Sequence, residues 1–152
     1  MLLSRGHQYA LQALVKLALR PPGEALMCRE LAEDLALPYP YLSKLMQHCA
    51  HLGLVGASRG RSGGYWLGNG VEAMTVRDLY VALNGERKTR ECLLGFKECG
   101  DETACVMHVE WKPLKEGVFE LMASQTLAEL AAAVREGRSR LGEVSPGCPL
   151  VR

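Results

Sequence analysis

Three short helical segments followed by a glycine-rich turn constrain the fold more than any other feature of this sequence. Apolar residues recur at helical spacing in residues 9–19, 27–36 and 40–51, and proline or glycine follows each segment. Strand-forming runs at 54–59 and 65–67 then flank the glycine-rich residues 60–64, which predicts a β-hairpin. Two helices joined by a tight connection and followed by a hairpin are typical of a winged helix-turn-helix domain.

The rest of the chain is predicted to be helical, with one irregular loop. Thr75 and Asp78 are spaced like a capping box, so we expect a helix that continues to Leu83. Residues 86–104 show little periodicity and predict a loop, whereas a long helical pattern covers residues 105–122 and a short one residues 126–135. Pro113 within the long pattern predicts either a start later than Val109 or a kink. The fold class is therefore mainly α with a small β-hairpin.

Composition agrees with this fold class and narrows the partners. Hydrophobic residues make up 48% of the 152 residues and aromatic residues only 6%, which favours helices over a β-sandwich. The net charge of +1 excludes a strongly basic nucleic-acid coat protein, but residues 1–70 carry +3 and residues 71–152 carry −2. We expect a cytoplasmic protein that does not enter the membrane, so its six cysteines are predicted to be thiols, ligands or redox groups.

The first half of the chain offers side chains suited to double-stranded DNA. On the exposed face of the third helical segment, Lys and Gln can bond base edges, and Ser and Tyr suit phosphates. An arginine on the glycine-rich turn can enter a minor groove or contact phosphates. The competing interpretation is that these are ordinary solvated polar positions. The predicted DNA-binding residues are Tyr41, Ser43, Lys44, Gln47, Arg59, Arg61 and Ser62.

One nucleotide-like motif does not support an enzyme. Residues 68–73 match G-x-G-x-x-A, but a dinucleotide site requires this motif in a βαβ unit, and the predicted hairpin before it is antiparallel. The sequence contains neither a C-x2-C pair nor a recognisable nucleophile motif. We therefore predict that the protein is not an enzyme.

Three cysteines and a histidine form the second candidate site. Cys92, Cys99, Cys105 and His108 follow the spacing C-x6-C-x5-C-x2-H. Thiolates held close together repel one another, and a metal relieves that repulsion. Soft thiolates with one imidazole suit an iron–sulfur cluster or zinc, and unligated thiols are the third alternative.

An apolar stripe on the long helical pattern predicts self-association. Val109, Leu114, Val118, Leu121 and Met122 are too apolar to leave in water on a single helix. We therefore expect a homodimer in which this stripe packs against its symmetry mate.

The motifs together resemble the IscR/NsrR family of bacterial transcription regulators, also called the Rrf family. The resemblance covers about residues 1–135. It rests on the three cysteines and on four segments of the sequence, which are YALQAL at 9–14, PYLSKL at 40–45, RGRSGGY at 59–65 and TLAEL at 126–130. Two departures are visible: the first cysteine gap is one residue longer than the common five, and Arg61 replaces the usual wing proline.

The resemblance implies a homodimer whose two winged domains bind a palindromic operator in double-stranded DNA. It implies that Cys92, Cys99 and Cys105 hold an iron–sulfur cluster, with [2Fe–2S] favoured and [4Fe–4S] possible, and that His108 is the fourth ligand. In other members that ligand is an acidic residue near the first helix of the partner subunit, where this chain has His7 and Gln8.

The implied organisation has four parts and one main alternative. Residues 1–84 form the winged helix-turn-helix DNA-binding domain, 85–108 the cysteine-rich cluster-binding loop, 109–136 the dimerisation helices and 137–152 a flexible tail. The implied function is a transcription regulator, a repressor by this resemblance, that senses redox state, nitric oxide or iron and cluster status. The alternative is a winged-helix regulator without a cluster, either zinc-bound or thiol-responsive.

Overall fold

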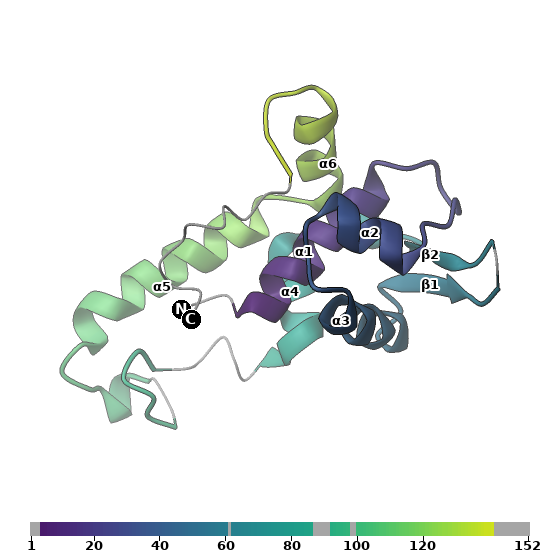
Figure 1. The fold of residues 1–152 in the computed structure, drawn as a ribbon. Helices are drawn as coiled ribbons and strands as arrows, with labels where there is room; N and C mark the ends of the chain where they lie inside the picture. Colours follow the sequence, from purple (N-terminus) through teal and green to yellow (C-terminus); the bar gives the residue numbers. More distant parts are fainter. Residues whose placement is uncertain (1–3, 61, 87–91, 98–99, 142–152) are drawn as a thin grey trace. The chain divides into compact units, whose positions relative to one another are not determined.

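The computed structural model describes residues 4–60, 62–86, 92–97 and 100–141 of the chain. The chain divides into two compact units, which Figure 1 shows in the colours of the sequence. We call residues 1–73 together with 127–152 the winged unit, and residues 74–126 the cysteine unit. Arg61, Cys99 and residues 142–152 of the expected tail lie outside the described residues.

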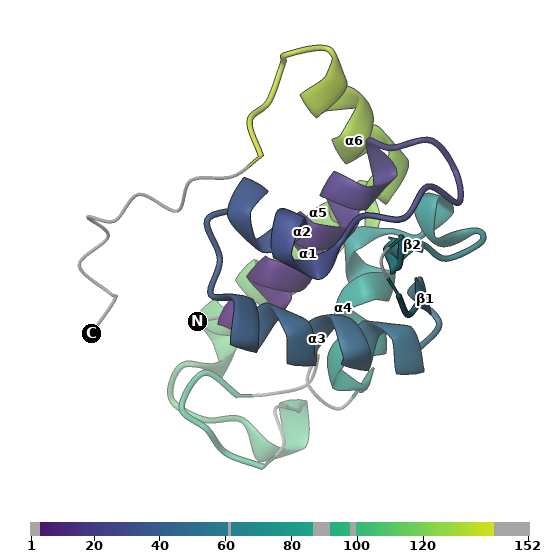
Figure 2. The ribbon, with the colours of Figure 1, turned by 45° about the vertical axis from the view of Figure 1, so that its right-hand side comes forward.

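The winged unit contains the predicted helix–helix–helix–hairpin order and one further helix from the end of the chain. Figures 1 and 2 show it from two directions. Its elements are α1 (Arg5–Ala18), α2 (Cys28–Asp34), α3 (Tyr39–His51), β1 (Val55–Ser58), β2 (Gly64–Leu67), the short 3₁₀ helix η1 (Val71–Ala73) and α6 (Leu127–Arg135). The mainly helical fold class with a small hairpin is confirmed.

The core of the winged unit lies around α1. This helix packs against α3, α6 and β2, and α2 packs against α3. Leu14 of α1, Leu31 of α2, Leu42 of α3 and Leu127 of α6 are fully buried. Each comes from the apolar face of an amphipathic helix, so burial of these faces holds α3 and the hairpin in place.

The hairpin depends on two close approaches that only glycine permits. In the antiparallel pairing of β1 with β2, Gly56 lies opposite Trp66, and a Cβ on Gly56 would lie 2.2 Å from the indole Cε2. Leu26 forms a further bridge to Tyr65 through backbone hydrogen bonds of 2.8 and 2.9 Å. A Cβ on Gly64 would lie 2.4 Å from the Leu26 carbonyl oxygen, so glycine is required at this position for the bridge to form. The pattern of the two strands does not reveal this bridge.

The cysteine unit is built on α4 (Val76–Asn84), the 3₁₀ turn η3 (Asp101–Thr103) and α5 (His108–Ala123). The expected capping box forms, because the Asp78 backbone N–H donates to Thr75 Oγ1 and the Thr75 N–H donates to Asp78 Oδ2. Helix α4 packs against α5, with the Tyr80 and Phe119 rings edge to face at 5.5 Å.

The long helix begins before Val109, so one of the two alternatives predicted from Pro113 is wrong. Helix α5 starts at His108 and includes Pro113, so a start later than Val109 is excluded. Pro113 has no N–H to donate to the Val109 carbonyl, and the helix continues past this missing bond. In the part of the chain that the structure describes, no helix is both long and apolar enough to cross a bilayer.

Candidate functional site

Helix α3 separates its apolar and polar residues in the way a DNA-reading helix requires. Leu42, Met46 and Cys49 are buried against the rest of the winged unit. Tyr41, Lys44 and Gln47 are exposed on the other side, whereas Ser43 is half-buried. The exposed groups therefore include the cation, amide and phenol needed for contacts to base edges and phosphates.

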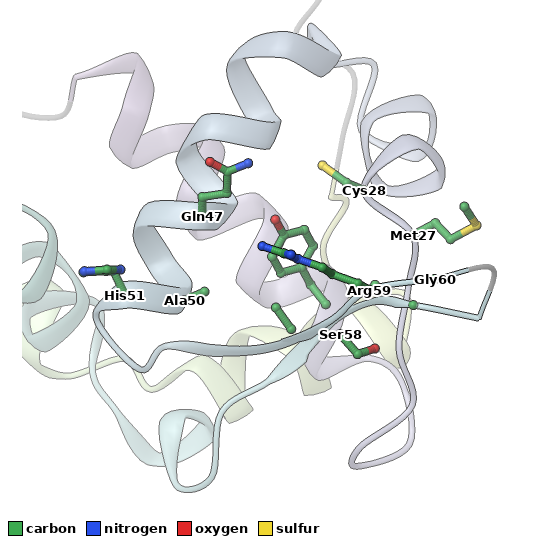
Figure 3. Close-up of a pocket in the computed structure, with 12 residues that line it drawn as sticks. Met27, Cys28, Gln47, Ala50, His51, Ser58, Arg59 and Gly60 are labelled. Atoms are coloured by element: carbon green, nitrogen blue, oxygen red, sulfur yellow. The ribbon is translucent and has the colours of Figure 1, made fainter.

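A hollow of about 720 Å³ lies between α3, the hairpin and the start of α2. Figure 3 shows Gln47 and His51 on α3, and Arg59 extending from the hairpin over the hollow towards that helix. Arg59 and Ser62 are both exposed. The hollow is lined by Met27, Cys28, Gln47, Ala50, His51, Ala57, Ser58, Arg59, Gly60, Gly63, Gly64 and Tyr65.

The titratable groups of this hollow leave its positive charge uncompensated. Burial raises the pKa of the Cys28 thiol, and a hydrogen bond from the Ser43 side chain lowers it in part. Burial also raises the pKa of the Tyr65 phenol, and that of the Cys49 thiol in the core beneath to about 11. These groups are therefore neutral at pH 7, so no thiolate opposes the charge of Arg59 toward a phosphate.

The sequence did not indicate Cys28 and Tyr65 as parts of this surface. Tyr65 could have been found, because alternation along β2 places it on the face opposite Trp66. Cys28 is at the first turn of α2, and only the packing of α2 on α3 brings it to Ser43.

Two of the three predicted cysteine ligands lie side by side in the cysteine unit. The Sγ atoms of Cys92 and Cys105 are 3.5 Å apart, too far for a disulfide bond of about 2.05 Å. Two thiolates that each lie about 2.3 Å from one tetrahedral metal are about 3.8 Å apart. The pair therefore fits a shared metal ion closely, although Cys99 lies outside the described residues.

His108 is held by a carboxylate that the sequence did not indicate. Its side chain is buried, and its Nε2 lies 3.0 Å from Asp101 Oδ1. Lys112 Nζ donates to both Asp101 oxygens at 2.9 Å. The bonds from Lys112 and from His108 lower the pKa of Asp101, whose carboxylate stays ionised at neutral pH.

The described residues do not bring all the predicted ligands together. Within 4–60, 62–86, 92–97 and 100–141, no three His, Cys, Asp or Glu side chains are grouped closely enough to hold a metal. His108 is therefore not grouped with the Cys92–Cys105 pair in this structure. The four-residue spacing of His108 and Lys112 places both on one helix face, but it gives no signal for Asp101, which lies before the helix in sequence.

The apolar face of α5 is narrower than the predicted stripe. Leu114 and Leu121 are 64% and 65% exposed, and with Val118 they lie on one face because of their i, i+4, i+7 spacing. Met122 is buried, and Val109 lies about 140° around the helix from Leu114. The two outer members of the predicted stripe therefore do not belong to this face.

Comparison with known protein families gives one family match over most of the chain. Residues 3–133 match the Rrf2 family model, described as an iron-dependent transcriptional regulator. This interval includes the whole cysteine unit, most of the winged unit and all three cysteines of the second candidate site.

Similar proteins and structures are transcription regulators. The regulator IscR of Erwinia tasmaniensis is 30% identical over 85% of this chain and 77% of its own length. The repressor NsrR of Streptomyces coelicolor is 32% identical over 88% and 90%. The solved structure of T. potens IscR has a TM-score of 0.69 at 27% identity, covering 92% of this chain and 93% of that one. CymR, the global cysteine regulator of B. subtilis, has a TM-score of 0.69 at 26% identity, with coverages of 86% and 95%.

Proposed function

Because this chain belongs to the Rrf2 family of iron-dependent transcriptional regulators, we propose that it is a dimeric repressor whose operator affinity depends on an iron–sulfur cluster. Like its relatives, the chain is a DNA-binding transcriptional regulator of the winged-helix type, and it is not an enzyme. The dimer, the cluster and the residue assignments are the parts proposed here. A regulator of this kind acts where the DNA is, so the proposed location is the cytoplasm.

The proposed DNA interface is α3 together with the tip of the hairpin. Lys44 and Gln47 are exposed on α3 and are assigned to base edges in the major groove. Arg59 extends from the hairpin and is assigned to a phosphate or to the minor groove. Tyr41, Ser43 and Ser62 are assigned to phosphates, as is Arg61, which lies outside the described residues.

The single observation that carries the cluster proposal is the 3.5 Å approach of Cys92 Sγ to Cys105 Sγ. These two side chains hold their sulfurs at nearly the spacing that one tetrahedral metal requires. Cys99 is assigned as the third ligand from the sequence. An iron–sulfur cluster bound by these thiolates would supply a group that gains or loses electrons and reacts with oxidants.

His108 remains the proposed fourth ligand, with a condition that the structure adds. Its Nε2 contacts Asp101, so this contact must either orient the ring for binding through Nδ1 or be broken. Lys112 keeps Asp101 ionised and in place, which makes Asp101 a positioning residue for the imidazole in the first case.

The proposed dimer covers the apolar face formed by Leu114, Val118 and Leu121 of α5. Two winged units joined in this way would read a palindromic operator, whose half-sites lie about one helical turn apart or a multiple of it. The cysteines assigned to the cluster precede this helix in sequence, and His108 is its first residue. Loss of the cluster is therefore expected to change the spacing of the two α3 helices and with it the affinity for the operator.

Metal analysis after anaerobic purification tests the proposal. We expect iron and acid-labile sulfide to be present with little zinc, and a visible chromophore to be lost together with the iron. Binding to the promoter of the protein's own gene is then measured at matched salt, with and without the iron. Zinc without sulfide would contradict the cluster, and equal operator binding in both forms would contradict its control of affinity.

The same sulfur pair favours a second candidate, a regulator that responds through its thiols. Two sulfurs 3.5 Å apart are close enough to form a disulfide after a small movement. In that case the protein would contain neither iron nor zinc, and operator affinity would change on oxidation and return on reduction. The metal analysis separates the two candidates directly.

A further inference from the structure

We propose that a second hollow in the winged unit binds a small carboxylate with an apolar body, and that this ligand adjusts the DNA-binding hairpin. The hollow has a volume of about 480 Å³, which is within the usual range of small-molecule sites. It lies where the end of α1, the turn after β2 and the end of α6 meet. Its lining includes Leu17, Arg20, Trp66, Asn69, Glu72 and Arg135.

Two guanidinium groups in this hollow have donors that are poorly used within the protein. Arg20 forms an ion pair with Glu24, but its Nε is buried and has no hydrogen-bond partner among the described residues. Arg135 Nη2 reaches the Ala18 carbonyl only at 3.4 Å, which is long for a hydrogen bond. Both arginines line the hollow, so an oxyanion there would accept charge-assisted hydrogen bonds from their guanidinium groups.

The other walls select for charge and shape. The Trp66 indole is held flat over Gly56, and Leu17 and Pro21 add apolar surface beside it. Glu72 also lines the hollow and offsets one of the two arginine charges, so a single carboxylate neutralises the positive charge that these lining residues leave. A monocarboxylate with an aromatic or aliphatic body therefore fits these walls better than a phosphate monoester does.

Strand β2 connects this hollow to the proposed DNA interface. Trp66 lines the second hollow, whereas the preceding residue Tyr65 lines the hollow beside α3. Consecutive residues of a strand point to opposite faces, so one short strand forms a wall of both. A ligand that fixes Trp66 and the end of β2 would therefore change the position of the hairpin and the affinity for the operator.

Binding of phenylacetate to the full-length protein tests the proposal, with phenylacetamide as the neutral isostere and phenyl phosphate as the dianion. For ten non-hydrogen atoms we expect a Kd for phenylacetate on the order of 1 mM, measured by ligand-observed NMR. Phenylacetamide is expected to bind roughly tenfold more weakly or worse, because it lacks the charge-assisted bonds. Phenyl phosphate is expected to bind more weakly than phenylacetate.

Arginine variants locate the binding. Arg20→Gln and Arg135→Gln should each weaken phenylacetate binding by roughly tenfold, whereas Arg138→Gln, an exposed arginine beyond α6, should leave it unchanged. Thermal unfolding identifies any variant that has lost its fold, and Arg20→Lys then serves in place of Arg20→Gln. A saturating concentration of phenylacetate should also shift the affinity for the operator in the wild type and not in the arginine variants.

Several results would overturn the proposal. Two concern the probes: equal binding of phenylacetate and phenylacetamide, or tighter binding of phenyl phosphate than of phenylacetate. The other two are wild-type phenylacetate binding by folded Arg20 and Arg135 variants, and an operator affinity that does not change when phenylacetate is bound. Operator binding without any probe is measured in the same series. Failure of the ligand site is therefore distinguishable from failure of the proposed regulator function.

Discussion

The winged unit and the cysteine unit bury their apolar side chains to very different extents. In the winged unit, all three helices that precede the hairpin contribute fully buried residues, such as Leu14, Leu31 and Leu42. In the described part of the cysteine unit, the buried apolar side chains are Leu79, Tyr80, Cys92 and Met122. The winged unit therefore has a core of its own, whereas we expect the cysteine unit to depend on further contacts for its stability.

The exposed apolar residues of the cysteine unit indicate which further contacts could stabilise it. On one face of α5, Leu114 is 64% exposed and Leu121 is 65% exposed. Large exposed apolar residues gathered on one face are typical of a protein–protein interface. The close Cys92 and Cys105 sulfurs are typical of a metal site. Under the proposed function, DNA recognition would rest on a unit with its own core, and sensing would rest on a unit that a metal and a second copy complete.

The largest expected difference between the units concerns iron. Cys92→Ala should abolish the visible chromophore and nearly all bound iron after anaerobic reconstitution, because a cluster loses one of its thiolates. Cys28→Ala removes a thiol from the winged unit and should leave the iron content unchanged. Iron and sulfide analysis of the two variants measures this. Retention of wild-type iron by Cys92→Ala, or its loss in Cys28→Ala, would break the assignment of metal binding to the cysteine unit.

The next prediction concerns self-association. Leu121→Glu should convert the dimer to a monomer of 16.7 kDa at micromolar concentration, since a charge would be buried in the apolar face of α5. Leu52→Glu places the same charge at a 40% exposed position of the winged unit and should leave the dimer intact. Light scattering gives both masses. A dimer for Leu121→Glu, or a monomer for the wild type, would contradict the proposed interface.

Core truncation compares the units directly. Leu14→Ala should destabilise the winged unit by about 2–5 kcal/mol, because Leu14 is fully buried and its loss leaves a cavity. Leu114→Ala should cost less than about 1 kcal/mol in the monomeric Leu121→Glu background, where no second copy covers α5. The units can be followed separately, because Trp66 lies in the winged unit and Trp111 in the cysteine unit. Urea unfolding with one tryptophan replaced by phenylalanine gives each value, and equal costs would refute the comparison.

A smaller effect is expected at the DNA interface. Arg59→Ala should weaken operator binding by about 1–3 kcal/mol if the guanidinium contacts a base, with no change in dimer mass. Arg138→Ala removes the same charge from a position beyond α6 and should leave the affinity unchanged. Fluorescence anisotropy at a fixed salt concentration measures both, and an unchanged affinity for Arg59→Ala would remove Arg59 from the interface.

The sequence predicted the winged unit better than the cysteine unit for a physical reason. Residues such as Leu14 and Leu42 recur with the helical period because they fill one continuous core, and the period is visible without a structure. The bridge between Leu26 and Tyr65 has no period, since it joins single residues through backbone atoms. It depends on Gly64, whose missing side chain was interpreted only as part of a turn.

In the cysteine unit, the contacts depend on how irregular segments return to the helix. Asp101 meets His108 and Lys112 across the turn η3, a juxtaposition that spacing alone does not reveal. The α5 stripe was predicted from residue type, but Val109 lies on another side of the helix and Met122 is buried. Pro113 is a further position at which local sequence did not decide the structure. Helix α5 continues through it despite one lost hydrogen bond, and α5 packs against α4.

The smallest predicted effect tests whether local capping matters more in a unit that has a small core. Asp78→Asn should destabilise the cysteine unit by about 1 kcal/mol at pH 7, since the carboxylate accepts hydrogen bonds from the Thr75 N–H and hydroxyl at 2.9 and 2.7 Å. These bonds lower the pKa of Asp78 below its ordinary value of 3.8. The folded state therefore binds this proton more weakly than the unfolded state does. The stabilisation is present above pH 3.8 and is lost as the pH falls through the lowered pKa.

The difference between wild type and Asp78→Asn should accordingly narrow in acid. Urea unfolding of the metal-free protein, followed by Trp111 in a Trp66→Phe background, measures that difference at several pH values. Thr75→Ala in the Asp78→Asn background should add less than it does in the wild type, because the two side chains act as one cap. A difference that stays constant from neutral pH to well below 3.8 would show that the Asp78 charge does not stabilise the start of α4. The capping box would then act through its neutral hydrogen bonds alone, and the weak core of the cysteine unit would have to be compensated by the dimer and the metal site.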